Sequence, residues 1–173
     1  MDYLIPEPWD IQWSRPYYNY EKHHQFFWSK IKDKAEGRIL DIGCGSASCW
    51  KDTNVELYGI DFSKKGIEQA LINYPNGQYL IGSFPTDYYD GMEFDTIVLS
   101  GIINYYYNLK PLLEMVKNAS KTGCLVLITI NVIQDFPGRK WDLERIKTEF
   151  SVLGEINAEF TEKIGWFVEI VVS

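Results

Sequence analysis

The stretch that decides the fold is LDIGCGSA, residues 40–47. It continues a short, mostly apolar run that starts at Arg38 and has the composition of a buried strand. Two glycines follow at once, Gly43 and Gly45. Glycine lets the backbone turn sharply and lets a ligand approach it closely. The stretch therefore predicts a strand that runs directly into a ligand-binding turn.

An acidic residue follows at the spacing of a nucleoside site. Asp61 lies 61 − 41 = 20 residues beyond Asp41, at the end of a second predicted strand, residues 55–60. A carboxylate at that place can accept hydrogen bonds from both hydroxyls of a ribose. The alternative is a tight turn whose acid only caps a helix. The strand context and the spacing together favour the nucleoside site.

The residues around the two glycines argue against a cofactor that carries phosphate. A dinucleotide site has a third glycine in the pattern G-x-G-x-x-G, and Ser48 occupies that position here. Asp41, two residues before the first glycine, would repel a nearby phosphate. A cofactor with no phosphate and a cationic amine fits better, and S-adenosylmethionine has both properties.

The glycine stretch resembles the first motif of the class I S-adenosylmethionine-dependent methyltransferases. Three later segments resemble further motifs of that superfamily, in the same order along the chain: YGIDFS at 58–63, FDTIVLSGIINY at 94–105 and KTGCLVL at 121–127. The resemblance covers about residues 20–173. It implies a Rossmann-like fold, a methyltransferase activity and S-adenosylmethionine as the cofactor, and it is silent on the substrate.

The resemblance also implies which residues contact the cofactor. They are Asp41, Gly43, Cys44, Gly45, Asp61, Phe62, Gly82, Ser83, Phe84, Ser100 and Gly101. In this scheme the glycine turn lines the methionine part and Asp61 holds the ribose. Phe62 packs on the adenine, and Ser100 lies under the sulfonium beside the substrate.

Four features depart from the usual pattern of that superfamily. Ala47 stands at its third glycine, Ser83 at the acid near the adenine amine, and Asn104 where many relatives carry histidine. The stretch between the glycine turn and Asp61 is short, so we expect an abbreviated first helix.

Three residues are candidates for catalysis: His23, His24 and Tyr105. Adjacent helix positions point about 100° apart, so at most one of the two histidines is expected to face a pocket, as a general base. The alternative is a pair of surface or capping histidines. Tyr105 follows the fourth strand, where the binding crevice of such a sheet opens.

The order of elements predicts the architecture. Strands are expected at 38–42, 55–60, 78–81, 95–100, 124–130, 157–163 and 166–172, with a turn at Gly165 inside the last pair, and helices at 19–35, 63–73, 109–119 and 142–153. Such alternation predicts a doubly wound, mostly parallel seven-stranded sheet with a C-terminal antiparallel hairpin.

Residues 1–18 are expected to form an arm outside a single domain at 19–173. Nine aromatic residues lie in the first 28 positions, and the arm contains Pro6, Pro8 and Pro16. One interpretation is a lid whose aromatic rings close over the substrate. The other is a cover that packs on one face of the sheet.

Composition narrows the function further. The net charge is −7 and no long basic run occurs, so nucleic acid is not the expected partner. No apolar run approaches the ~20 residues of a membrane span. The three cysteines, Cys44, Cys49 and Cys124, form no CxxC pair, which predicts neither disulfides nor a metal site and favours the cytoplasm.

We therefore expect methyl transfer to an oxygen, nitrogen or sulfur atom of a small molecule. One alternative is a non-catalytic or regulatory module that binds S-adenosylmethionine. Another is a methyltransferase that acts on a protein or RNA. The sequence leaves open whether the protein is a monomer or a homodimer.

Overall fold

The computed structural model describes residues 10–11, 20–106, 108–131, 141–162 and 164–173, with only the backbone described for 20–24. Most of the predicted arm, residues 1–18, therefore lies outside the described residues, as does the connection at 132–140.

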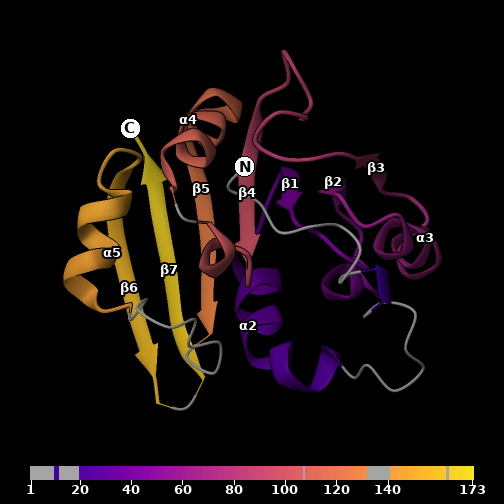
Figure 1. Cartoon of the computed structure of the whole chain (residues 1–173), viewed down its shortest axis with the longest axis horizontal. Helices are drawn as coiled ribbons and strands as arrows, with labels where there is room; N and C mark the ends of the chain where they lie inside the picture. Colours follow the sequence, from indigo (N-terminus) through magenta and orange to yellow (C-terminus); the bar gives the residue numbers. More distant parts are fainter. Residues whose placement is uncertain (1–9, 12–19, 107, 132–140, 163) are drawn as a thin grey trace.

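Seven strands form one sheet in the order β3-β2-β1-β4-β5-β7-β6 (Figure 1). They are β1 (Arg38–Ile42), β2 (Glu56–Asp61), β3 (Gln78–Ile81), β4 (Phe94–Ser100), β5 (Ser120–Asn131), β6 (Gly154–Thr161) and β7 (Gly165–Val172). The first five run parallel, and β7 pairs antiparallel with both β5 and β6. The predicted doubly wound sheet with a terminal hairpin is confirmed.

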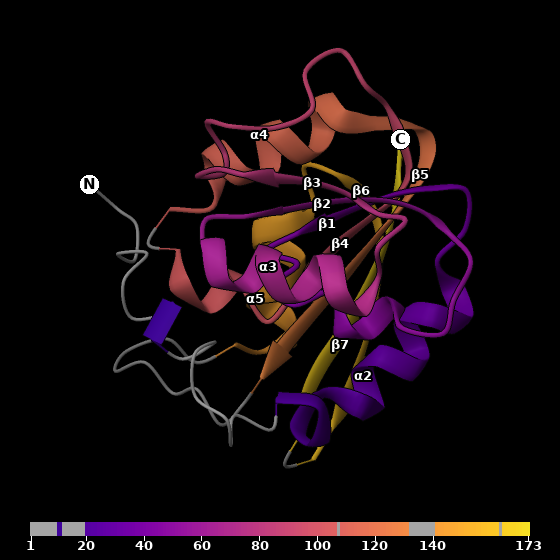
Figure 2. The ribbon, with the colours of Figure 1, turned by 90° about the vertical axis from the view of Figure 1, so that its right-hand side faces the viewer.

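Helices cover both faces of the sheet. They are α2 (Tyr20–Lys34), α3 (Lys64–Asn73), α4 (Lys110–Ala119) and α5 (Leu143–Phe150), with 3₁₀ turns η1 (Ser48–Trp50) and η2 (Ile103–Tyr105). One core joins α4 and α5 to the sheet, and a second joins α2, η1 and α3 to its other face. Figure 2 shows α4 and α2 on opposite sides of the strands.

Local sequence signals set several element ends. Ser63 accepts a hydrogen bond from Gly66 N at 3.0 Å and caps α3, and Asp142 accepts one from Arg145 N at 2.9 Å and caps α5. The abbreviated first helix is confirmed, because only the three residues of η1 follow the glycine turn.

The C-terminal hairpin turns earlier than predicted. Gly165 is not in the turn; it opens β7, opposite Thr161 of β6 and Asn131 of β5. Its φ is +139°, and an added Cβ would lie 1.9 Å from the Ile130 carbonyl oxygen. Glycine is thus required there for close approach of two strands, a role that sequence alone does not separate from a turn.

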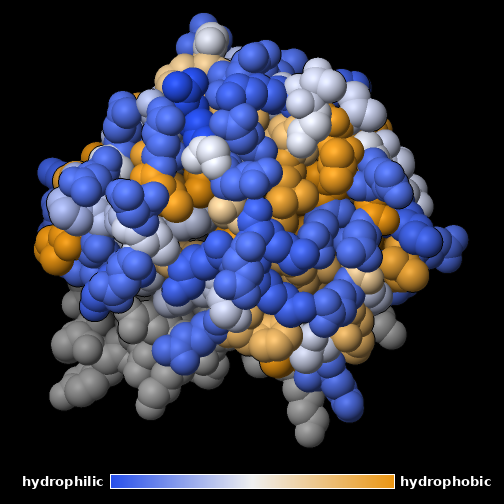
Figure 3. Space-filling model, turned by 180° about the vertical axis from the view of Figure 1, so that it is seen from behind, coloured by the Kyte–Doolittle hydropathy of each residue, from blue (hydrophilic) through white to orange (hydrophobic). Residues whose placement is uncertain are grey.

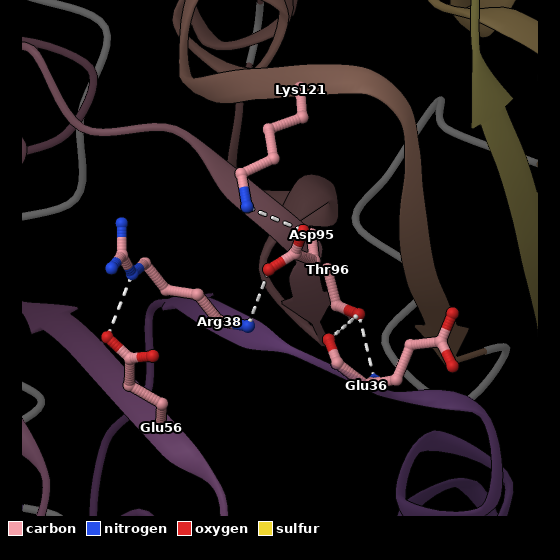
Figure 4. Close-up of polar contacts among 6 residues, drawn as sticks. All are labelled: Glu36, Arg38, Glu56, Asp95, Thr96 and Lys121. Carbon is pink, nitrogen blue, oxygen red and sulfur yellow. Dashed lines mark hydrogen bonds and ion pairs between the residues drawn. The ribbon is translucent and has the colours of Figure 1, made fainter.

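Polar contacts join the amino ends of the central strands (Figure 4). The Asp95 carboxylate accepts hydrogen bonds from Arg38 N at 2.8 Å and from Lys121 Nζ at 2.7 Å. Thr96 Oγ1 accepts from Glu36 N at 3.0 Å and donates to Glu36 O at 2.8 Å. These bonds link β1, β4 and β5 at the end of the sheet opposite the glycine turn.

Candidate functional site

The glycine turn lies over the end of β2. The amides of Gly43 and Cys44 both donate to the Ile60 carbonyl, at 2.8 and 3.2 Å, and Gly45 N donates to Asp61 Oδ2 at 2.9 Å. Gly43 and Gly45 have φ of +74° and +49°, a region that favours glycine. The predicted turn therefore exists, and it brings Asp61 to the loop as the spacing predicted.

Two glycines allow close packing around this turn. A Cβ added to Gly43 would lie 2.4 Å from Ile102 Cγ2, so Ile102 closes one side of the turn. A Cβ added to Gly66 of α3 would lie 3.3 Å from the backbone of Gly45, which brings the start of α3 against the loop. Any larger side chain at these positions would displace its neighbour.

Asp41 is held by a residue that the sequence did not reveal. The indole Nε1 of Trp50 in η1 donates to Asp41 Oδ2 at 2.6 Å. Trp50 is fully buried and Asp41 is 5% exposed. Burial raises the pKa of Asp41 to about 7, although the hydrogen bond from Trp50 opposes the shift. The only signal in the sequence was a tryptophan within the short turn after the glycines.

Each carboxylate oxygen of Asp61 accepts one hydrogen bond from a backbone amide. Ser63 N donates to Oδ1 at 2.8 Å, and Gly45 N donates to Oδ2. Burial raises the pKa of Asp61 to about 6, against the effect of the two amides. Each carboxylate oxygen can accept a second hydrogen bond, so Asp61 can still receive a hydroxyl from a ligand.

Aromatic side chains gather beyond the ends of β2 and β3. The rings of Phe62 and Phe84 lie 6.3 Å apart at 27°, and Tyr106 lies 6.0 Å from Phe84. The Tyr106 hydroxyl donates to the Phe84 carbonyl at 3.2 Å. The structure thus brings together Phe62 and Phe84, the two rings expected to flank an adenine.

The segment after β3 carries an acid that sequence reasoning missed. Gly82 N donates to the Asp61 carbonyl at 3.0 Å, which fixes this segment beside β2. Ser83 N donates to Asp87 Oδ2 at 2.9 Å. A carboxylate therefore lies next to Ser83. It comes from Asp87 in the following turn and not from residue 83, where the resemblance placed an acid.

Ser100 and Gly101 lie at the carboxyl end of β4. Ser100 Oγ is 3.1 Å from Thr129 Oγ1 of β5, and Gly101 N donates to the Thr129 carbonyl at 3.2 Å. A small cavity between the glycine turn and α2 reaches Ser100, and Trp28 and Ile31 of α2 form its wall. Figure 1 shows the ends of β4 and β5 next to α2.

Of the three catalytic candidates, the structure describes the side chain of Tyr105. Tyr105 is half-buried in η2, beyond the end of β4. Asn104 beside it is buried and donates to the Asn131 carbonyl at 3.3 Å. His23 and His24 lie in α2, but their side chains are outside the described residues.

The structure argues against Cys44 as a nucleophile. A Cβ added to Gly59 of β2 would lie 2.8 Å from its Sγ, so the thiol packs against the sheet. Burial raises the pKa of this thiol well above its usual range. Among the described residues no cluster of histidine, cysteine and acidic side chains could hold a metal ion.

The arrangement suits a nucleoside that carries positive charge. Two buried carboxylates, Asp41 and Asp61, lie on either side of the glycine turn, and both have a raised pKa. A cationic ligand would favour their ionised forms, whereas a phosphate would not. The small cavity lies beside the turn, where Asp41, Gly43 and Cys44 line it.

Comparisons with known proteins bear on the family and the fold of the chain. A family model described as a methyltransferase domain matches residues 33–164. An uncharacterized protein of Methanocaldococcus jannaschii is 28% identical over 116 residues, which is 66% of this chain and 55% of that protein. The chain therefore spans about half the length of this curated relative.

Solved structures share the fold. The N-methyltransferase NodS of Bradyrhizobium japonicum, solved with S-adenosyl-L-homocysteine, has a TM-score of 0.71 at 12% identity, covering 96% of this chain and 97% of its own. The protein solved with the Trm112 methyltransferase activator of Haloferax volcanii has a TM-score of 0.76 at 13% identity, covering 95% and 96%.

Proposed function

This chain belongs to the methyltransferase-domain family, and we propose that it transfers the methyl group of S-adenosylmethionine to an oxygen, nitrogen or sulfur atom of a small molecule. Use of S-adenosylmethionine follows from the family. The roles of individual residues and the nature of the acceptor are our proposals.

The described residues fit the cofactor. Asp61 has free lone pairs for the ribose, Asp41 suits a cationic amine, and the half-buried ring of Phe62, stacked on the buried Phe84, suits an adenine. Gly43 lines the small cavity, so a ligand there would lie against the backbone of the glycine turn. When bound, the cofactor supplies an already activated methyl group, so the protein mainly aligns the acceptor and excludes water.

The wall formed by α2 is the observation that supports a small acceptor. Trp28 and Ile31 are buried and line the cavity opposite the glycine turn, and Ser100 and Val98 line it from β4. A polymer could not reach the glycine turn from the α2 side, because these buried side chains fill that side apart from a cavity of about 20 Å³. The net charge of −7 also disfavours RNA.

Asp10 supports the proposal that the arm is a lid. Its carboxylate accepts hydrogen bonds from Ser63 Oγ at 2.5 Å and from Lys65 N at 3.2 Å. Ser63 also donates its backbone N–H to Asp61. One residue of the arm is therefore tied next to the acid that we assign to the ribose.

The cofactor assignment is tested by calorimetry of Asp61→Ala. Loss of a charge-assisted pair weakens binding by about 1.5–3 kcal/mol, so affinity for S-adenosylmethionine should fall at least about tenfold. Asp33→Ala, an exposed acid of α2, is the matched control and should bind as the wild type does. Near wild-type binding by Asp61→Ala would refute the role of this residue, and a preference for NAD would refute S-adenosylmethionine as the cofactor.

The acceptor class is tested with S-adenosylmethionine labelled on its methyl group. The protein is incubated with a cell extract divided into small molecules, RNA and proteins, and the labelled fraction is identified. We expect label in the small-molecule fraction with wild type and much less with Asp61→Ala when S-adenosylmethionine is below saturation. Label confined to protein or RNA would contradict the proposed acceptor.

A further inference from the structure

The two edges of the sheet differ in charge. At one edge, β6 carries two exposed glutamates, Glu155 and Glu159. At the other edge, β3 (Gln78–Ile81) carries no charged residue. Charges on an edge strand discourage the addition of another strand, and an uncharged edge lacks this protection.

Apolar side chains are exposed beside the uncharged edge. Tyr79 packs against Gly59 on the face that α3 covers, and Ile81, two residues later, has its side chain on the same face. Ile81 is 51% exposed. On the α3 side of the molecule (left in Figure 3), hydrophobic side chains form small areas among hydrophilic ones.

One flank of α3 extends this apolar surface. Asn73 Nδ2 donates to the Ser46 carbonyl at 2.9 Å, so that flank of α3 faces the glycine turn. Helix positions two apart differ by about 200°, which places Leu71 on the opposite flank, toward the β3 edge. Leu71 is 51% exposed. Figure 2 looks at the molecule from this side, with α3 in front.

An acidic groove adjoins the same edge. It has a volume of about 510 Å³, and its lining residues are Leu80, Ile81, Thr86, Asp87, Tyr88 and Asp90. Two of the six are carboxylates and none is basic. The occupant that complements this groove therefore combines apolar side chains with positive charge.

We propose that the β3 edge is the docking site of a partner protein, which adds an extended segment of alternating apolar and Lys or Arg residues beside β3. The segment pairs with the edge backbone, its apolar residues cover Ile81 and Leu71, and its basic residues lie beside Asp87 and Asp90. Because Asp87 also binds Ser83 N, docking reaches the segment that we assign to the adenine. The proposal goes beyond the proposed function and does not depend on it.

The test uses the full chain and labelled peptides of about eight residues, a common strand length. One peptide alternates valine with lysine, and the other alternates valine with glutamate. Fluorescence anisotropy should show that the lysine peptide binds and that its affinity falls with salt. Ile81→Lys should weaken binding about tenfold by placing a charge on the edge, and Asp90→Asn about threefold.

Two variants on the β6 side of the sheet are controls. Val152→Lys places a lysine at an exposed apolar residue in the turn before β6, and Glu155→Gln removes a carboxylate from β6. Both should bind the lysine peptide as the wild type does. Equal binding of the two peptides, or equal losses in the control variants, would overturn the proposal. Circular dichroism checks folding, and Asp90→Asn, at an exposed residue, keeps the test valid if Ile81→Lys does not fold.

Two further measurements separate this surface from its alternatives. Sedimentation should show that the wild type does not dimerise through the β3 edge. A dimer that Ile81→Lys abolishes would mean that a second copy of the chain occupies this edge, and it would refute the proposal. Calorimetry with S-adenosylmethionine should give the same affinity for Ile81→Lys and wild type. A loss of cofactor binding in that variant would show that the edge is part of the cofactor site instead.

Discussion

Asp41 couples the charge of the site to the stability of the fold. Its folded pKa of about 7 is raised by burial above the usual range of an aspartate. A folded state with a raised pKa binds the proton more tightly than the unfolded state. The stability from this proton is complete below about pH 4 and is lost as the pH rises through about 7. Asp61, with a pKa of about 6, acts in the same direction.

This predicts a difference between wild type and Asp41→Asn in urea denaturation. From about pH 5 to about pH 7.5 the free energy of unfolding of the wild type should fall more steeply than that of the variant. Asparagine can still accept the Trp50 hydrogen bond, so the variant isolates the titration. Equal slopes for the two proteins would show that Asp41 is ionised throughout this range.

Cys44 illustrates a residue whose backbone matters more than its side chain. Its amide donates to Ile60, while its thiol is buried under Gly59 with a raised pKa. We expect Cys44→Ala to keep both S-adenosylmethionine binding and methyl transfer, measured by calorimetry and label incorporation. A variant that binds but no longer transfers would instead place the thiol in the reaction.

At the scale of elements, the network around Asp95 holds the amino ends of three strands. The hydrogen bond from Lys121, followed by that from Arg38 N, lowers the pKa of Asp95. A lowered pKa means that this stability is present above about pH 4 and is lost as the pH falls through the folded value. The amino ends of β1, β4 and β5 are therefore held together best at neutral pH.

Asp95→Asn should lower the free energy of unfolding by about 1 kcal/mol at neutral pH, because the side chain is partly exposed and the pair is screened. Glu114→Gln is the control, since its pair with Lys110 is long, at 4.0 Å, and exposed. Its effect should be within about 0.5 kcal/mol. Equal effects in chemical denaturation would refute a structural role for the Asp95 network.

At the scale of the whole molecule, the sequence predicted the features that depend on neighbouring residues in the chain. The apolar runs gave the strands, Ser63 and Asp142 gave two helix starts, and the paired glycines located the turn that contacts Asp61. Two site residues were not predicted, because only the folded chain places them beside their partners. Trp50 reaches Asp41 through η1, and Asp87 reaches Ser83 through a turn.

The role of the arm depends on where it lies relative to the sheet and the glycine turn. Phe27, Trp28 and Ile31 of α2 cover the sheet face behind the glycine turn. Asp10 contacts the start of α3, close to Asp61. We propose that the arm, held there through Asp10, closes over a ligand.

Deletion of residues 1–18 distinguishes the lid from the cover. A lid predicts a folded protein whose S-adenosylmethionine affinity stays within about threefold, but whose methyl transfer is nearly abolished, because water is no longer excluded from the acceptor. A cover predicts a large drop in melting temperature together with loss of binding. Asp10→Ala is the point-variant counterpart: under the lid it lowers transfer and leaves the melting temperature nearly unchanged. A stable and fully active truncation would refute both roles.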